Sequence, residues 1–256
     1  MIEKFINFYN NIPELWRHSV YRLKMQKNWF LYALAIGIVL ILGLTLILKL
    51  IGMLDIKQAT ILYRLVGLNV FGIIWIAIYI NYRFYPRDYY VTRHYNTSPL
   101  LYLLISSALY SGILLVLMLV IALVKPVSAD TAIWGVIYYT IMSFCFIFIF
   151  SFLLGMIYIL YPNLDRIYIV ITILIFLILP VIFIPNATSH TVTHILMMNP
   201  VYYLVNGMQQ SVIVGHNALN HLSYHLYFLS FMGLIIVFCF ALNDYVSQLR
   251  PNEHVK

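Results

Sequence analysis

The feature that most constrains this chain is a long stretch without a single charged side chain. Between Arg166 and Asp244 the sequence contains no Asp, Glu, Lys or Arg. A helix that crosses a bilayer needs only about 20 consecutive apolar residues, so this stretch is too long for one span. We therefore expect two spans here, Ile167–Ile184 and Leu222–Leu242, joined by an uncharged connector.

The connector has a pattern of its own. Its middle, Met197–Gly215, reads MMNPVYYLVNGMQQSVIVG and places apolar residues at helical spacing. A fully solvated connector of this length would usually carry charge. Broken segments at membrane depth are tolerated where they are buried in protein or line a cavity. We therefore predict re-entrant or outer helices over residues 195–215.

The composition is that of an integral membrane protein. Hydrophobic residues make up 63% of the chain and charged residues only 9%, whereas soluble domains have about 25% charged residues. We expect one all-α membrane domain over residues 1–256, with no room for a separate catalytic domain. Cys145 and Cys239 both fall in the middle of apolar segments, where packing is expected rather than a disulfide.

Apolar segments of spanning length recur four more times, which makes six expected spans with the two above. The additional spans are Phe30–Gly52, Ile61–Ile80, Leu100–Val124 and Ile133–Leu160.

Positively charged residues are unevenly divided between the two sides of these spans. Because Lys and Arg are enriched in cytoplasmic segments, the richer side predicts that both termini are cytoplasmic, as in a multi-pass protein of the bacterial plasma membrane. The net charge of +7 therefore reflects topology and does not indicate a nucleic-acid partner. The side of the N-terminus holds Lys4, Arg17, Arg22, Lys24, Lys27, Arg83, Arg87, Arg93, Arg166, Arg250 and Lys256, and the opposite side holds Lys49, Lys57, Arg64 and Lys125.

The segment before the first span is amphipathic and basic. We expect residues 1–28 to form a separate helix that lies on the cytoplasmic leaflet, with apolar side chains among Lys and Arg. Its apolar residues are Phe5, Tyr9, Ile12, Leu15, Trp16 and Val20.

Motifs for catalysis or ATP binding are missing from the sequence. There is no GxxxxGK[ST] loop, no HExxH and no GxSxG. All eight acidic residues are expected in loops or tails, which disfavours a proton- or sodium-coupled carrier. The pairs His190/His194 and His221/His225 have helical spacing, but no acid or cysteine stands near them, so no metal site is predicted.

The expected cytoplasmic loop between the second and third spans, Asn81–Pro99, reads NYRFYPRDYYVTRHYNTSP. It is basic, rich in Tyr and too short to be a domain. Arg and aromatic side chains are typical anchors of protein–protein contacts, and they are equally typical of interfacial belts. The residue types alone leave both interpretations open.

The C-terminal half resembles a known family. Tyr161–Pro185, YPNLDRIYIVITILIFLILPVIFIP, followed by Met198–Gly215, MNPVYYLVNGMQQSVIVG, is similar to permease subunits of type-2 ABC exporters, above all the polysaccharide and teichoic-acid export branch. In that branch an acidic cytoplasmic turn precedes the fifth span, prolines end it outside, and an Asn-Pro-x-Tyr motif opens re-entrant helices. The likeness covers about residues 80–245.

The resemblance implies specific sites. FYPRDYY (Phe84–Tyr90) resembles the segment that docks into a groove of the ATPase subunit, and the Asn-Pro-x-Tyr motif implies a re-entrant helix beside the translocation path. For the two tyrosines of that motif, packing or interfacial anchoring competes with path lining. The expected coupling residues are Tyr85, Pro86, Arg87, Asp88 and Tyr89, and those of the re-entrant motif are Asn199, Pro200, Tyr202 and Tyr203.

The resemblance also implies partners. Two ABC ATPase subunits would bind ATP and Mg²⁺, a second permease copy, identical or homologous, would complete the path, and membrane lipids would surround it. The chain itself would then be a transport subunit and not an enzyme, with no cofactor, metal or nucleic acid of its own.

Two features depart from the family pattern. The usual Gly-x-x-Trp stretch is replaced by RLKMQKNWFLYAL, and Asn206 and Gln209 stand where Glu and Arg are frequent. We expect export of a lipid-linked glycan of the teichoic-acid or polysaccharide type. The alternatives are a permease for a peptide, lipid or drug, a non-transporting partner of a heteromeric exporter, and an enzyme or assembly factor of cell-envelope synthesis.

Overall fold

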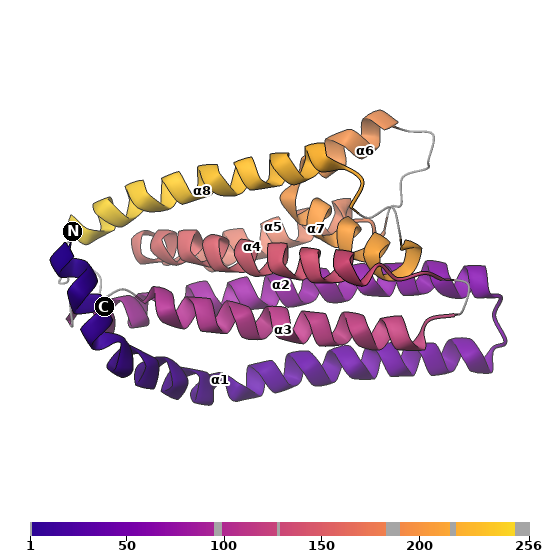
Figure 1. Ribbon diagram of the computed structural model, residues 1–256, viewed down its shortest axis with the longest axis horizontal. Helices are drawn as coiled ribbons and strands as arrows, with labels where there is room; N and C mark the ends of the chain where they lie inside the picture. Colours follow the sequence, from indigo (N-terminus) through magenta and orange to yellow (C-terminus); the bar gives the residue numbers. More distant parts are fainter. Residues whose placement is uncertain (1, 95–98, 127–128, 183–189, 216–218, 249–256) are drawn as a thin grey trace.

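The computed structural model describes residues 2–94, 99–126, 129–182, 190–215 and 219–248. Every regular element in this part is helical, and no β-strand occurs in it (Figure 1). The elements are α1 Ile2–Leu50, α2 Asp55–His94, α3 Leu100–Val124, α4 Ile133–Leu160, α5 Leu164–Ile178, α6 His190–Met197, α7 Pro200–Gln209, the π-helical turn η1 Gln210–Val214, and α8 Leu222–Gln248.

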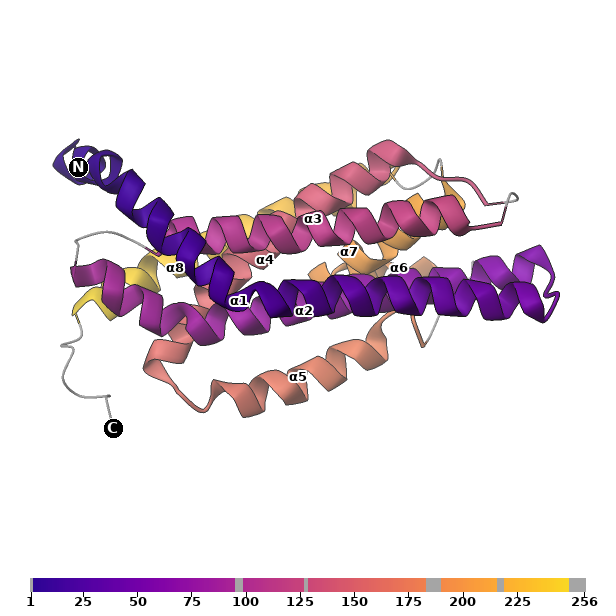
Figure 2. The same ribbon diagram turned by 90° about the horizontal axis from the view of Figure 1, so that it is seen from below.

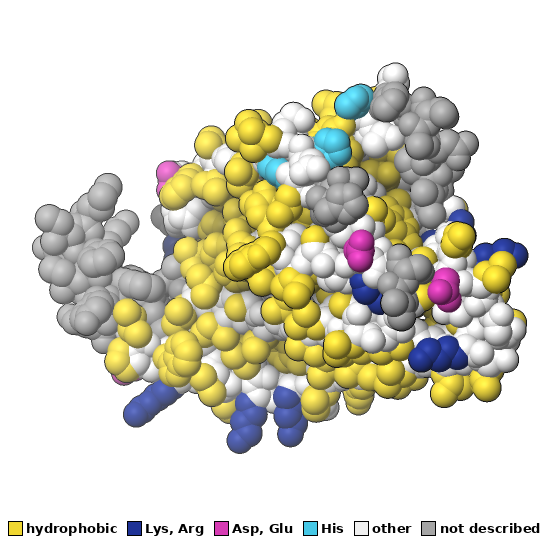
Figure 3. Space-filling model, turned by 45° about the vertical axis from the view of Figure 1, so that its right-hand side comes forward, with side chains coloured by type: hydrophobic (Ala, Val, Ile, Leu, Met, Phe, Trp, Pro, Cys, Tyr) yellow, Lys and Arg dark blue, Asp and Glu magenta, His cyan; other side chains and the backbone are white. Residues whose placement is uncertain are grey.

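Five of these helices, α1 to α4 and α8, are long and apolar enough to cross a membrane. They run alongside one another, and the start of α1 and the end of α8 lie at the same end of the bundle (Figure 1). Large hydrophobic side chains such as Val39, Leu123 and Phe240 are exposed on them. Hydrophobic side chains also dominate the surface in Figure 3, where charged ones are sparse. An apolar surface of this extent suits a lipid environment.

Helix α2 forms the centre of the bundle. Val66, Val70, Ile74, Ala77 and Ile78 follow the spacing of one helical face, and each is fully buried. Helices α3 and α4 pack against α2, and α1 packs mainly against α3. The core therefore forms around α2, while α1 and α8 lie at the periphery (Figure 1).

Two helices have the bounds of expected spans. Helices α3 and α4 cover Leu100–Val124 and Ile133–Leu160, as the sequence predicts.

The separate N-terminal helix over residues 1–28 was a wrong prediction. Helix α1 runs without interruption from Ile2 to Leu50, although its N-terminal part bends away from the rest (Figure 2). Between Pro13 and Gly37 there is no Gly or Pro to break a helix. The helix ends at Leu50, two residues before Gly52, whose φ of +63° suits glycine, and Gly52 and Met53 donate backbone hydrogen bonds to the last turn.

The expected cytoplasmic loop 81–99 is also largely helical. Helix α2 continues through Pro86 to His94, and residues 95–98 lie outside the described part of the chain. A proline within a helix removes one backbone hydrogen bond and disturbs the preceding turn. The helix nevertheless continues here, and the side chains of Tyr85 and Asp88 on either side of the proline are both buried.

The fifth expected span, Ile167–Ile184, is not found as such. Helix α5 has 15 residues, Leu164–Ile178, and would extend about 22 Å, less than the ~30 Å of a bilayer core. Pro180 explains the early end, because a proline disfavours helical geometry in the residue before it. Leu179 accordingly has an extended backbone, with ψ of 152°. The described chain thus has five helices of spanning length instead of six.

The segment expected to be re-entrant, residues 195–215, is helical over most of its length and packs into the bundle. Asn199 caps α7 by accepting a hydrogen bond from the backbone N–H of Val201, and Pro200 occupies the first turn, as the sequence predicts. Helix α7 lies between α8 and α2 in Figure 1. Its depth in a membrane, and hence the re-entrant arrangement, stays a prediction.

A close helix crossing gives a first test of this packing. A Cβ at Gly155 of α4 would lie 2.4 Å from Cγ of the buried Tyr85 on α2, so we expect Gly155→Ala to lower the free energy of unfolding. The cost should be about 1–3 kcal/mol, as for other overpacked cores. Gly112→Ala is the control because a Cβ there meets nothing within 4 Å. Thermal unfolding in detergent measures both, and equal midpoints would contradict the packing described.

Candidate functional site

The C-terminal end of α2 has one exposed face and one buried face. Arg83, Arg87, Tyr90 and Val91 are exposed at helical spacing and form what we call the basic face. The opposite face packs into the bundle. Of the five expected coupling residues, Arg87 is exposed, Pro86 is partly buried, and Tyr85, Asp88 and Tyr89 are buried. A docking partner could therefore contact only part of the predicted set.

Asp88 forms a buried ion pair with α1. Its carboxylate lies 2.8 Å from Nε of Arg22, and Nη2 of Arg22 donates to the other oxygen at 3.4 Å. The Arg22 and Asp88 side chains are only 4% and 1% exposed. His18 adds a third group, with Nε2 3.5 Å from the same carboxylate. The expectation that all acids lie in loops or tails was wrong for Asp88.

Aromatic rings surround the Arg22 guanidinium. It lies 5.2 Å from the centre of the Phe84 ring and 5.8 Å from that of Tyr102. The Tyr102 hydroxyl donates a hydrogen bond to the side-chain oxygen of Gln26, one turn along α1. Cation–π contacts of this kind partly compensate a cation for its lost hydration.

The N-terminal part of α1 buries a stripe of three polar residues. Ser19, Arg22 and Gln26 are buried, at 2–3% exposure, and their spacing in the sequence indicated one helical face. The exposed side is mixed, because Trp16 and Tyr21 are 53% and 61% exposed and the basic residues Arg17, Lys24 and Lys27 are exposed as well. Such a mixture of aromatic and basic side chains suits a helix at a membrane surface.

The same end of α2 also contacts α8. Arg93 donates a hydrogen bond to the backbone carbonyl of Ser247 at 2.9 Å. Tyr85 and Tyr89 share a buried cluster with Val246 of α8 and Met156 of α4. The basic face is therefore carried by a segment that α1, α4 and α8 hold in place.

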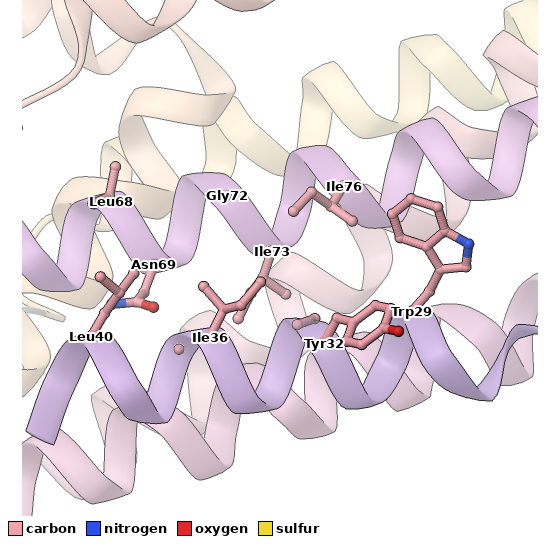
Figure 4. Close-up of a pocket in the computed structure, with 11 residues that line it drawn as sticks. Trp29, Tyr32, Ile36, Leu40, Leu68, Asn69, Gly72, Ile73 and Ile76 are labelled. Carbon is pink, nitrogen blue, oxygen red and sulfur yellow. The ribbon is translucent and has the colours of Figure 1, made fainter.

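An apolar groove runs between α1 and α2 inside the apolar part of the bundle. It encloses about 300 Å³. A second cavity of about 360 Å³ lies between α2 and α5. Figure 4 shows Trp29 and Tyr32 of α1 at one end of the first cavity and Leu40 and Asn69 at the other. The two cavities share Trp29, Gly72 and Ile76, so we treat them as one groove.

Aromatic residues form the α5 side of this groove. Trp75 stacks on Tyr168 with ring centres 5.2 Å apart. The Tyr168 hydroxyl donates to the backbone carbonyl of Trp75 at 2.7 Å, and the Trp75 indole N–H donates to the Thr172 hydroxyl. The groove is therefore apolar and aromatic, with hydroxyl groups along one wall.

At the other end of α2, two amides of α7 hold Tyr63. The Tyr63 hydroxyl donates to Oδ1 of Asn206 at 2.8 Å. Nε2 of Gln209 donates to the Tyr63 carbonyl at 2.9 Å and to the Pro180 carbonyl at 3.3 Å. Asn206 and Gln209 thus join α2, α7 and the turn after α5 without any charge.

The tyrosines of the predicted re-entrant motif are packing residues in this structure. Tyr202 and Tyr203 are each 1% exposed, and neither lines the groove. Burial raises the pKa of Tyr202 to about 12, and burial, with the neighbouring Tyr138 and Tyr139, also raises the pKa of Tyr203. Both phenols are therefore neutral at physiological pH.

One histidine of each pair contacts a tyrosine hydroxyl group. Nδ1 of His225 lies 2.5 Å from the Tyr203 hydroxyl, and Nδ1 of His194 hydrogen-bonds the Tyr224 hydroxyl. Among the described residues no cluster of three His, Cys, Asp or Glu could hold a metal ion. His190 and His194 flank one turn of α6, but the side chain of His190 is not among those described.

Comparison with known proteins gives no family for this chain. No family model matches it, and neither does any curated protein.

The buried ion pair predicts a specific stability pattern. We expect Arg22→Met or Asp88→Leu alone to lower the free energy of unfolding by about 3–5 kcal/mol, because each leaves one buried charge unpaired. The free energy of unfolding of the double variant should fall by less than that of either single variant, since no lone buried charge remains. Thermal midpoints of the four proteins in one detergent test this. Additive losses in the double variant would show that the two side chains do not depend on each other.

Proposed function

We propose that this protein is the membrane subunit of an ATP-driven exporter in the bacterial plasma membrane, with both termini cytoplasmic. Two ATPase subunits would bind ATP and Mg²⁺, and a second permease, identical or homologous, would complete the path. The observation that carries the proposal is the helical end of α2, where Arg83, Arg87 and Tyr90 are exposed on a segment anchored on its other side.

This end of α2 suits the transmission of movement. Arg and Tyr are enriched in the energetically dominant contacts of protein interfaces. Here they stand on one helix that continues without interruption to Asp55 at the opposite end. A partner that displaced Arg87 would act on a rigid element of the bundle core, and not on a free loop.

The groove supports a lipid-linked cargo. Its walls are apolar enough for an acyl or prenyl chain, and Trp29, Tyr32, Trp75 and Tyr168 offer aromatic rings. The polar groups of Trp75 and Tyr168 are already hydrogen-bonded within the protein, so these two rings would contact a cargo through their apolar faces. Together with the resemblance of the sequence to glycan exporters, this supports a lipid-linked glycan of the teichoic-acid or polysaccharide type as cargo.

Most of these features of the groove would also suit other cargoes. A lipid or drug would fit the apolar wall between Ile36 and Ile76 equally well, and the preference for a glycan comes from the resemblance of the sequence. An enzyme of envelope synthesis is less well supported, because the buried Asp88 is occupied by Arg22 and does not face the groove residues.

The first test of the proposal concerns the basic face. Arg87→Glu should abolish copurification of an ATPase subunit and cargo export, because it reverses the charge of an exposed anchor without disturbing a buried contact. Lys57→Glu, an equally exposed charge at the other end of α2, is the control. The measurement is purification of the tagged protein from its native host in mild detergent, with identification of the copurifying proteins.

Two results would decide against the proposal. One is normal ATPase copurification with Arg87→Glu. The other is recovery of the unaltered protein without any ATPase under conditions that preserve known transporter complexes, which would favour the envelope-enzyme or assembly-factor alternative.

The second test fills the groove. Gly72 borders both cavities, and a Cβ there meets nothing within 4 Å. We expect Gly72→Trp to occupy the groove and reduce export of surface glycan, while ATPase copurification persists. Gly43→Trp is the control, because Gly43 is exposed on α1 and likewise free of neighbours. Surface glycan is measured by labelling intact cells in which the variant replaces the native copy. Undiminished labelling with Gly72→Trp would exclude the groove as the cargo route.

A further inference from the structure

We infer that the Arg22–Asp88 ion pair is a latch that makes the N-terminal part of α1 and the cytoplasmic end of α2 move as one unit. In this view Asp88 is a positioning residue, which acts on α1 through Arg22. The latch itself follows from the geometry alone, while its part in transport rests on the proposed function.

The path of α1 makes this contact important. Along the apolar part of the bundle the groove separates α1 from α2, and α1 leans on α3 instead. Phe30 packs on Tyr110 with ring centres 4.6 Å apart, and Gly37 lies against Leu117. Near the cytoplasmic end, by contrast, α1 reaches α2 through Arg22, Asp88 and His18. The latch therefore joins α1 and α2 at one end, whereas the groove separates the same two helices farther along the bundle.

The chemistry of the contact favours one fixed register of α1 against α2. A buried ion pair adds little net stability, because removing both charges from water costs about as much as their attraction returns. A lone buried charge is strongly unfavourable, so the pair holds Arg22 and Asp88 together in one register. Small sliding of α1 along α2 is thus opposed until the carboxylate and the guanidinium separate completely.

The position of Asp88 connects the latch to the basic face. Asp88 follows directly after the exposed Arg87, and Phe84, one turn earlier, lies under the Arg22 guanidinium. A displacement of the basic face would therefore carry α1 with it. Since α1 supplies Trp29, Tyr32 and Ile36 to the groove, docking at the cytoplasmic end would change the width of the groove.

The test measures the distance between the two helices in the full-length protein. Spin labels are placed at Tyr21→Cys and Val91→Cys, both exposed positions, in a background with Cys145→Ser and Cys239→Ala. Pulsed electron–electron double resonance should give one narrow distribution of distances between the two labels. We expect the neutral pair Arg22→Met/Asp88→Leu, which leaves no lone charge, to fold and to broaden this distribution. The control Asp55→Asn, at the exposed far end of α2, should leave it narrow.

The outcomes separate the latch from the proposed function. A narrow distribution in the folded neutral pair would overturn the latch, whatever the protein transports. A broadened distribution supports it. For the coupling role, we expect the neutral pair to keep ATPase copurification yet to lose transport by about tenfold, within the usual range of coupling between sites. Unchanged transport alongside a broadened distribution would overturn the coupling role alone. Recovery of the unaltered protein without any ATPase subunit would instead contradict the proposed function.

Discussion

The structure depends on how the polar groups of α2 find partners inside the bundle. The hydrocarbon core of a bilayer offers no hydrogen-bonding groups, so a polar side chain within it must be satisfied by protein. Helix α2 has such partners at three levels. Asp88 pairs with Arg22 near the C-terminal end of α2, Asn81 accepts from Ser106 at 2.7 Å farther in, and Tyr63 binds Asn206 near the N-terminal end. Each partner stands on a different helix, so together they fix the register of α1, α3 and α7 against α2.

The parts of the fold that were predicted correctly are those set by hydrophobicity alone. Helices α3 and α4 begin and end where their apolar runs do, because both runs are bounded by loops with proline or polar residues. Hydrophobicity says little about helices that extend beyond the membrane. Thus α1 begins well before its expected span and α2 continues well past its own, since the polar residues there are good helix formers or are packed against neighbours. The short α5 was missed for the opposite reason, because Pro180 ends an apolar run that composition alone would continue.

The candidate site was predicted less well, because burial depends on tertiary contacts that a single segment does not reveal. The resemblance predicts FYPRDYY as a docking segment, but its division into an exposed Arg87 and a buried Asp88 requires a helix packed on one side. The inward polar stripe of Ser19, Arg22 and Gln26 was visible in the sequence. It was overlooked because an amphipathic surface helix is expected to turn its charged side outward. Likewise, Tyr203 could be placed in the core only once its contact with His225 was known.

The distribution of charge along α2 gives a physical reason for the neutral residues Asn206 and Gln209. The cost of burying an ion falls where water or mobile polar groups are near, and rises with depth in the apolar bundle. Asp88 lies near the C-terminal end of α2, where the side chain of His18 beside it is still 28% exposed. Gln209 is fully buried and serves two backbone carbonyls, those of Tyr63 and Pro180. An amide can join such carbonyls without desolvating a charge, whereas an acid or a guanidinium there would need a buried counter-ion. Neutral residues at the junction of α2, α7 and the turn after α5, and a charged pair near the C-terminal end of α2, therefore follow from the same constraint.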